Sequence, residues 1–270
     1  MAALVNERAQ IVSNEPIGPR LHLMVLKSPL IARSVRPGQF VHMKIPSAEQ
    51  HILRRPFSVY AADENTGILD ILYQEVGSLT RFMPSIGRGE IEMIGPIGNE
   101  WSGPQRFAEG RASHALLVGG GVGAAPLFML AQTLCGNGCP TDVVLGAQTY
   151  EALVTRGRYI DLLGTEPLCA TDDGSYGRAG FCTSLVEERL RDGCLADGKP
   201  YDYLAVCGPE PLMRIVARMG ADAGVYTEIS MEKRMACGIG ACLSCVVDTV
   251  DGKGRSCVDG PIFDGSKVVW

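Results

Sequence analysis

The chain has 270 residues, of which 46% are hydrophobic and 20% are charged, a composition typical of a soluble globular protein. This length is enough for two domains of ordinary size, each with its own core. The net charge of -5 gives no electrostatic reason to expect nucleic acid as a partner. No apolar run reaches the roughly eighteen residues of a membrane span, and the start MAALVNERAQ lacks the basic and apolar regions of a signal peptide. We therefore expect a cytoplasmic protein that binds neither nucleic acid nor membranes.

Residues 1–104 read as short strands separated by turns. Glycine-containing turns at Pro37-Gly38, 65–67 and 87–89 punctuate segments that alternate or run apolar. Several short strands at this spacing predict an antiparallel barrel or sandwich. The expected strands lie in RLHLMVLKS, QFVHMKIP, FSVYAAD, GILDILYQEVG and EIEMIGPIG.

The pattern changes near residue 105, where strands begin to alternate with helices. HALLVGGGVGAAPLFMLAQTLC is an apolar strand, a glycine-rich turn and a helical pattern, and TDVVLGAQ is a second apolar strand. A third strand lies in EPLCATDDGS, SLVEERLRDG is a helix ending in glycine, and YDYLAVCGPEPLMRIVARMGADAG is again strand, turn and helix. This alternation predicts a parallel sheet over residues 105–225.

The glycine-rich turn has the spacing of a dinucleotide-binding turn. Gly119, Gly121 and Ala124 fit G-x-G-x-x-[GA] between an expected strand and an expected helix, and Gly123 lies within the same turn. Glycines at these positions let a pyrophosphate approach the backbone at the start of a helix. We expect Gly119, Gly121 and Gly123 to contact the nucleotide.

Two further features qualify this nucleotide site. The usual acidic residue at the end of the second strand is missing, because Gln148 or Thr149 stands there and Asp142 is at the opposite end. No arginine at Gln148 could hold a 2′-phosphate, which favours NAD over NADP. Cys207 closes a strand before the Gly208-Pro209 turn at the carboxyl edge of the sheet, where ligands bind. Cys207 is thus a candidate catalytic residue, although a buried strand cysteine before a turn would look the same.

The expected barrel contains two weak signals for an anionic cofactor. In RRPFSVY, Arg55 could pair with a diphosphate, and the backbone at Phe57 and Ser58 could lie along a flavin ring. An Arg-Pro pair at the start of a strand is common, so this signal alone has a purely structural interpretation. Residues 77–80 form a turn into a short expected helix, whose N-terminus offers free N–H groups to an anion.

Residues 226–270 contain four clustered cysteines with the spacing Cys237-x4-Cys242-x2-Cys245-x11-Cys257. C-x4-C-x2-C followed by a distant cysteine is the plant-type [2Fe–2S] pattern. Gly238 and Gly240 would let the loop curl inward without side-chain clashes. A zinc site more usually shows separated C-x2-C pairs, and disulfides are not expected without a secretory signal. The spacing favours an iron–sulfur cluster, which transfers single electrons.

Taken together, the order of these motifs resembles the ferredoxin-NADP⁺-reductase-like flavoprotein superfamily. The barrel with Arg-Pro-Phe-Ser comes first, then the glycine-rich turn, then Cys-Gly-Pro. The appended SMEKRMACGIGACLSCVV looks like the electron-transfer subunits of class 1B dihydroorotate dehydrogenases. The resemblance covers nearly the whole chain, and this C-terminal segment is its most specific part.

The resemblance implies an antiparallel FAD-binding barrel over 1–104, a parallel-sheet NAD-binding domain over 105–225 and a [2Fe–2S] module over 226–270. It implies cluster ligation by the four clustered cysteines. The family has G-x-G-T at its third flavin segment, whereas this chain has leucine at position 79, which does not easily adopt a positive φ. The implied FAD contacts lie in three segments: Arg55, Pro56, Phe57 and Ser58; Leu72, Tyr73 and Gln74; and Leu79 with Thr80.

The resemblance also implies a partner and a direction of electron flow. A separate FMN-containing catalytic subunit would oxidise dihydroorotate in pyrimidine biosynthesis, within a heterotetramer of two plus two chains. Electrons would pass through the [2Fe–2S] cluster and FAD to NAD⁺. A flavin exchanges one or two electrons, so it can connect a cluster to NAD. His22, His42, His51 and His114 are dispersed, and we interpret them as ordinary surface or strand residues.

Two alternatives stay open. The chain could be the relay subunit of a related NAD(P)H:ferredoxin oxidoreductase, sulfide dehydrogenase or sulfhydrogenase, which have the same layout of cofactors and a different partner. It could also be a non-enzymatic redox sensor, although no DNA-binding or signalling module accompanies the motifs.

Overall fold

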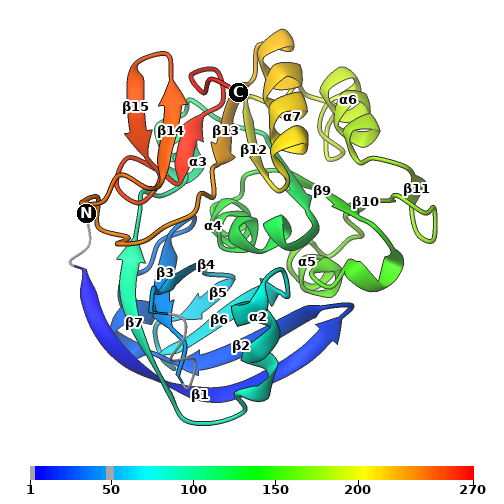
Figure 1. The fold of residues 1–270 in the computed structure, drawn as a ribbon. Helices are drawn as coiled ribbons and strands as arrows, with labels where there is room; N and C mark the ends of the chain where they lie inside the picture. The colour runs from blue at the N-terminus through cyan, green and yellow to red at the C-terminus, as the bar shows by residue number, and fades with distance from the viewer. Residues whose placement is uncertain (1–3, 47–51) are drawn as a thin grey trace.

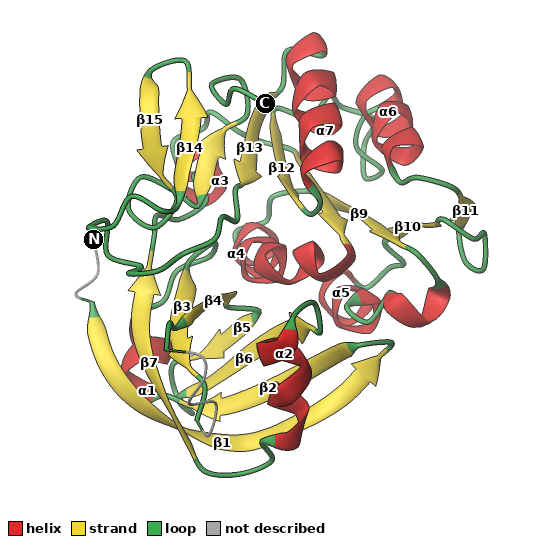
Figure 2. Cartoon of the chain, viewed as in Figure 1, coloured by secondary structure: helices red, strands yellow, loops and turns green. Residues whose placement is uncertain are grey.

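Two seven-stranded sheets form the body of the computed structural model, which describes residues 4–46 and 52–270 (Figure 1). The first sheet curls at the bottom of the view, and the second stands above it between helices (Figure 2). A two-stranded hairpin near the C-terminus lies beside the second sheet. This arrangement confirms the predicted combination of an antiparallel barrel-like part with an α/β part.

The first sheet is antiparallel throughout and has the strand order β4-β3-β7-β1-β2-β6-β5. It is an open barrel, because β4 and β5 remain its two edges. Alternate side chains fill its interior, including Met24, Met43 and Ile71, which have no exposed surface. The strands are β1 (Val5–Gly18), β2 (Leu21–Lys27), β3 (Phe40–Lys44), β4 (Arg55–Ser58), β5 (Ala61–Asp63), β6 (Ile68–Gln74) and β7 (Glu90–Ile97).

One expected strand of this sheet is in fact two. The segment FSVYAAD leaves the sheet after Ser58 and re-enters it at Ala61 on the opposite edge. Between them, the N–H of Val59 donates to the carbonyl of Gln39 at 3.2 Å, and that of Tyr60 donates to the carbonyl of Asp70 at 2.9 Å. The apolar run reads as one strand because both crossing residues are buried, at 1% and 2% exposure.

The second sheet has the order β11-β10-β9-β8-β12-β13-β16 and is parallel except for β16. The order reverses between β8 and β12, so the loops after these strands diverge around a crevice at their carboxyl ends. Its strands are β8 (Ala115–Gly120), β9 (Thr141–Ala147), β10 (Leu168–Thr171), β11 (Arg178–Ala179), β12 (Tyr203–Cys207), β13 (Tyr226–Ser230) and β16 (Ile262–Asp264).

Both faces of this sheet are buried, as a parallel sheet requires. Leu117 and Leu145 face a core shared with α4 and α5, whereas Leu116 and Val206 face a core shared with α6 and α7. Burying one such side chain stabilises the fold by about 1.5–3 kcal/mol. The helices are α1 (Pro29–Ser34), α2 (Ser78–Phe82), α3 (Gly103–Ala108), α4 (Phe128–Gly136), α5 (Arg156–Leu163), α6 (Thr183–Asp192) and α7 (Glu210–Asp222), with 3-10 turns η1 (Met83–Ser85), η2 (Gly121–Leu127) and η3 (Tyr150–Ala152).

The cysteine-rich segment is joined to the second sheet at both ends. Strand β13 pairs with β12, and β16 returns antiparallel to β13 after the hairpin of β14 (Val246–Thr249) and β15 (Gly252–Arg255). A division at residue 225 therefore cuts through a continuous sheet. The three-part division of the chain at residues 104 and 225 stays a prediction.

Candidate functional site

The predicted flavin segments line a single cavity of about 350 Å³. Its walls come from β4, the end of β6 and the turn into α2, with Val122, Ala125 and Pro126 of η2 opposite them. The structure thus brings together residues that are separate in the sequence. The predicted members of this wall are Arg55, Pro56, Phe57, Ser58, Leu72, Tyr73, Gln74, Leu79 and Thr80.

An acidic residue that the sequence motifs do not single out also lines this cavity. The Ser58 hydroxyl donates to Oε1 of Glu232 at 3.1 Å, across 174 positions of chain. The Glu232 side chain is open to the cavity, yet the surrounding protein is dense enough that burial raises the pKa of its carboxyl. The same carboxyl acts electrostatically on Cys207. Ser58 and Glu232 therefore meet at this cavity, and the Glu232 carboxyl acts on Cys207 through electrostatics alone.

The third flavin segment differs from the expectation in its backbone. Leu79 lies in α2, and its side chain is 5% exposed and packs in the barrel core. Leu79 does not have a positive φ, because Arg20 and Leu243 are the residues other than glycine that have one in the described part of the chain. The Oγ1 of Thr80 accepts the N–H groups of Val76 at 2.9 Å and Gly77 at 3.0 Å. Those two N–H groups, which precede the first helical residue, Ser78, are therefore already bonded.

The glycine-rich turn packs against the end of β12. Gly119 pairs with Cys207 in register, and a Cβ at Gly119 would come 2.6 Å from Cα of Ala124. A Cβ at Gly123 would come 2.6 Å from the carbonyl oxygen of Cys207. Gly121 has φ +55 and open space around it. Two of the three glycines thus serve close backbone packing, and the third serves the turn conformation.

Cys207 is buried, and burial raises the pKa of its thiol well above the ordinary value. Its thiol is therefore neutral at neutral pH. Asp142 lies at the far end of β9, as expected, where its carboxylate accepts hydrogen bonds from the Tyr201 hydroxyl and the N–H of Leu195. Gln148 is exposed after the carboxyl end of β9.

The cluster loop, residues 237–245, is held in a tight curl by positive φ angles. Gly238 has φ +68, Gly240 has φ +83 and Leu243 has φ +57. A Cβ at Gly240 would come 2.7 Å from Val258, so the loop also lies close against the chain that follows it. The predicted inward curl around the cysteines is therefore present.

The four sulfur atoms fall into two pairs of neighbours. Sγ of Cys245 and Sγ of Cys257 are 3.4 Å apart and buried, whereas Cys242 is exposed and interacts with Cys237. Cys237 also acts electrostatically on Cys257, which links the pairs. Two thiolates on each of two irons is the arrangement that a [2Fe–2S] cluster needs, so these residues fit that group.

The thiols differ in how readily they ionise. Hydrogen bonds from the hydroxyl and backbone N–H of Ser244, with a smaller contribution from Cys237, lower the pKa of Cys242 to about 6. Burial, with the neighbouring Cys245, raises the pKa of Cys257 to about 12. Because iron binds the thiolate form, the lowered pKa of Cys242 suits it to be an iron ligand.

A buried histidine lies beneath this loop. His42 in β3 is completely buried, and burial followed by the charge of Arg54 lowers the pKa of its ring to about 4. His22 in β2 and His42 in β3 are strand residues, as one of the two expected placements had it, and His114 lies just before β8; all three are buried, His22 and His114 at 6% and 5% exposure. His51 lies outside the described residues.

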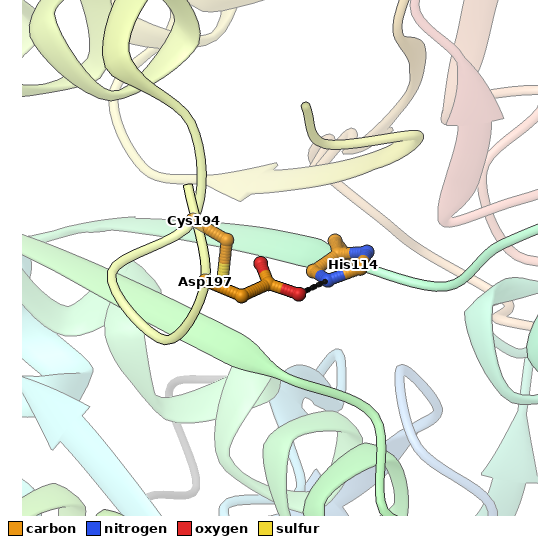
Figure 3. A group of neighbouring side chains, drawn as sticks. All are labelled: His114, Cys194 and Asp197. Atoms are coloured by element: carbon orange, nitrogen blue, oxygen red, sulfur yellow. Dashed lines mark hydrogen bonds and ion pairs between the residues drawn. The ribbon is translucent and has the colours of Figure 1, made fainter. Parts of the chain in front are cut away.

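A second group of potential metal ligands lies at the other end of the second sheet (Figure 3). Donor atoms of His114, Cys194 and Asp197 all lie within 4.8 Å of one another. Nε2 of His114 is 3.0 Å from Oδ2 of Asp197, and Nζ of Lys199 is 3.0 Å from the same oxygen. This carboxylate already binds two positively charged or donating groups, so the arrangement is complete as an ion-pair network.

Comparison with known proteins places the cysteine-rich segment in a family. Residues 232–269 match the family model described as the iron–sulfur cluster binding domain of dihydroorotate dehydrogenase B. The chain is 35% identical over 267 residues to the dihydroorotate dehydrogenase B (NAD(+)) electron transfer subunit of Geobacillus sp. (strain WCH70), covering 97% of this chain and 98% of that protein. The chain belongs to the family of dihydroorotate dehydrogenase B electron transfer subunits. A relative from Desulforamulus reducens is 34% identical over 268 residues, with 97% of each chain covered.

Solved structures agree with this family. A structure of NADH-dependent reduced ferredoxin-NADP oxidoreductase, described in work on electron bifurcation, is 27% identical with a TM-score of 0.84 and covers 97% of this chain and 90% of its own. A ferredoxin NADP⁺ reductase from Neisseria gonorrhoeae with bound FAD and NADP shares the fold at 15% identity and a TM-score of 0.67, covering 83% of this chain and 98% of its own. The predicted fold, the electron-transfer function, the oxidoreductase class and the cofactor set of FAD, [2Fe–2S] and NAD are confirmed by these matches. In the described ranges, no helix has the length and apolar character to cross a membrane.

Proposed function

We propose that this chain carries electrons in sequence between a partner protein, the four cysteines, the flavin cavity and the nucleotide turn. In this arrangement FAD occupies the cavity of β4, β6 and α2, and a [2Fe–2S] cluster is held by Cys237, Cys242, Cys245 and Cys257. NAD binds at Gly119, Gly121 and Gly123. The bound flavin supplies the exchange between single electrons and a hydride.

The observation that carries this proposal is that the flavin wall is shared by two cavities. One cavity continues to Val122, Ala125 and Pro126 after the nucleotide turn. A second, of about 800 Å³, continues along residues 232–235 toward the cysteines. Arg55, Pro56 and Ser58 line both. A flavin seated on this wall would therefore face the nicotinamide on one side and the cluster on the other.

The residues of the chain have distinct tasks in the hydride step. Ser58 and Glu232 hold each other at the edge of the cavity, so they fix the approach of a nicotinamide to the flavin ring. Cys207 contributes a neutral, buried surface behind the nicotinamide. Arg55, whose guanidinium donates to the carbonyls of Leu53 at 3.0 Å and Arg54 at 3.1 Å, is placed to pair with the diphosphate.

The partner we propose is an FMN-containing dihydroorotate dehydrogenase catalytic subunit, with two copies of each chain in a cytoplasmic heterotetramer. Support comes from the names of the relatives, which are electron transfer subunits of dihydroorotate dehydrogenase B. The exposed Cys242 and Leu243 place the cluster loop at the surface, where a partner can dock. Met235, by contrast, is 9% exposed and packs with Cys245 and Cys257 inside.

The test is to purify the chain with its partner and measure FAD, FMN, iron and mass. We expect one FAD and two irons per copy, an FMN in the partner, and NAD⁺ reduction that depends on dihydroorotate. Native mass spectrometry would report the two-plus-two assembly. Full FAD and iron content without dihydroorotate-dependent NAD⁺ reduction would contradict the proposed partner, but not the proposed relay of electrons.

A second candidate is a relay subunit for ferredoxin. The observation that favours it is the 27% identity and TM-score of 0.84 to the NADH-dependent reduced ferredoxin-NADP oxidoreductase. The two candidates differ in what reduces the chain. Reduction of its flavin by ferredoxin in place of the dihydroorotate-oxidising subunit would select this alternative.

A further inference from the structure

The side chain of His42 lies between the flavin strand and the cluster loop. Its backbone in β3 is opposite Pro56 of β4 on one side and Ile94 of β7 on the other. Its ring reaches Gly238, where a Cβ would come 2.7 Å from Nδ1 and 3.3 Å from Cε1. One residue thus contacts the loop between the first two cysteines and belongs to the strand next to the predicted flavin contacts.

The ring of His42 is buried, and its two nitrogens need to be accounted for. His42 has no exposed surface, and within the described ranges neither Nδ1 nor Nε2 has a partner at normal geometry. His22, another buried barrel histidine, differs because its Nε2 lies 2.7 Å from Glu75. A buried imidazole always carries at least one N–H, and leaving that donor unpaired is unfavourable.

The surroundings indicate where an acceptor must lie. On the β4 side the ring interacts with the backbone of Arg54, and the guanidinium groups of Arg54 and Arg55 offer no acceptor. On the loop side the ring interacts with the backbone of Cys237, the first of the four clustered cysteines. The ring therefore has a backbone group on each side, and the one on the loop side belongs to a predicted cluster ligand.

We propose that His42 is a positioning residue for the iron–sulfur cluster. It supports the loop at Gly238 and donates its ring N–H toward Cys237, on the side where the cluster binds. The inference rests on the proposed function, in which Cys237 is a cluster ligand. A hydrogen bond toward cluster sulfur stabilises the reduced, more negative state and raises the reduction potential. His42 would thus determine both the position of the cluster next to the flavin and the difference in reduction potential between the two.

The experiment compares His42→Phe, which removes both nitrogens, with His42→Gln, which keeps an N–H donor. The readouts are iron and FAD content, the cluster potential by redox titration, and the EPR spectrum of the reduced cluster. We expect His42→Phe to keep FAD and to shift the reduction equilibrium about tenfold toward the oxidised cluster, which is about 59 mV for one electron. His42→Gln should recover most of this shift.

His114→Gln is the matched control, because it removes a buried imidazole from the far end of the second sheet. Its cluster potential and spectrum should equal those of the wild type. If phenylalanine prevents folding, His42→Leu replaces it as the nitrogen-free variant. A nitrogen-free variant with full iron and an unchanged potential and spectrum would overturn the inference, as would equal loss of iron in the leucine and glutamine variants. A wild-type protein without a [2Fe–2S] spectrum would instead contradict the proposed function.

Discussion

The two glycine-rich turns of this molecule use glycine for different reasons. At the nucleotide turn, a Cβ on Gly119 or Gly123 would meet backbone atoms of Ala124 or Cys207. At the cluster loop, a Cβ on Gly238 or Gly240 would meet the side chains of His42 or Val258, and both glycines have positive φ. The first turn is fixed by backbone packing onto the sheet. The second is held by side chains.

This difference predicts how each turn responds to change. The nucleotide turn lies on buried strands, with Leu117 and Val118 completely buried before it. The cluster loop has no helix or strand between Met235 and Cys245, and Cys242 is exposed. We therefore expect substitutions in the cluster loop to remove one cofactor without unfolding the protein. Substitutions in the nucleotide turn should reduce stability as well.

The largest effect is expected for Cys242→Ser. Serine is a poor iron ligand, so we expect iron content to fall to near zero while FAD content stays close to that of the wild type. Because loss of an outer-shell partner of a metal site already costs 10–100-fold, electron transfer to the partner should fall by more than about a hundredfold. The measurements are metal analysis, flavin absorbance and turnover of the complex. Cys135→Ser, in α4, is the control, and loss of FAD together with iron in Cys242→Ser would contradict the separation of the two sites.

Glu232→Gln tests the acidic residue that lines both cavities. We expect flavin reduction by NADH to slow by about ten- to a hundredfold, because Ser58 and the nicotinamide would lose a charged positioning partner. Iron content should not change. Stopped-flow reduction of the flavin measures the effect, and an unchanged rate would remove Glu232 from the hydride step.

The same variant has a predicted pH dependence. Burial raises the pKa of Glu232 above its ordinary 4.5, so the folded protein holds this proton more tightly than the unfolded chain. The contribution of this group to stability is full below the ordinary pKa and is lost as the pH rises through the folded value. Glu232→Gln should therefore gain stability over the wild type at neutral pH and match it in acid. Urea unfolding at several pH values checks the sign.

The sequence predicted the parts of the site whose chemistry is local. Four cysteines at fixed spacing and glycines after an apolar strand carry their signal within a few positions. Glu232 and His42 carried none, because each acts through a contact more than a hundred and fifty positions away, with Ser58 and with Gly238 respectively. His42 lies in the apolar-polar pattern FVHMK, which reads as an ordinary strand.

The same distinction holds for the fold. Strands β8, β9, β10 and β12 of the second sheet were predicted because each is a short, mostly buried apolar run. Strand β1 was missed because half of its residues are polar, most of them at least partly exposed, and it contains Pro16. The return of β16 to β13 could not be predicted, because strand pairing across the intervening cysteine-rich segment has no local pattern.

Gly123→Ala tests the rigid turn. The added Cβ would come 2.6 Å from the carbonyl oxygen of Cys207 and from Cα of Gly208, and neither backbone atom can move without disturbing β12. We expect a loss of about 1–3 kcal/mol in the free energy of unfolding and a raised KM for NADH. Gly157→Ala, in α5 with open space around it, is the control and should be neutral or slightly stabilising. Equal stability of the two variants would show that the nucleotide turn is as tolerant as the cluster loop.

The smallest effect is expected for Leu243→Gly, at the exposed tip of the cluster loop. Leu243 has φ +57 and is 62% exposed, so a leucine there costs about 1–2 kcal/mol of backbone strain without burying its side chain in this chain. Glycine would relieve that strain, and the isolated subunit should become slightly more stable. The assembled complex should instead turn over a few-fold more slowly, because an exposed apolar side chain beside Cys242 is placed to pack against the partner. Val250→Gly, on the hairpin turn and 68% exposed, is the matched control and should leave turnover unchanged. Equal effects of the two substitutions on turnover would mean that the strained loop serves the cluster alone and that the partner docks elsewhere.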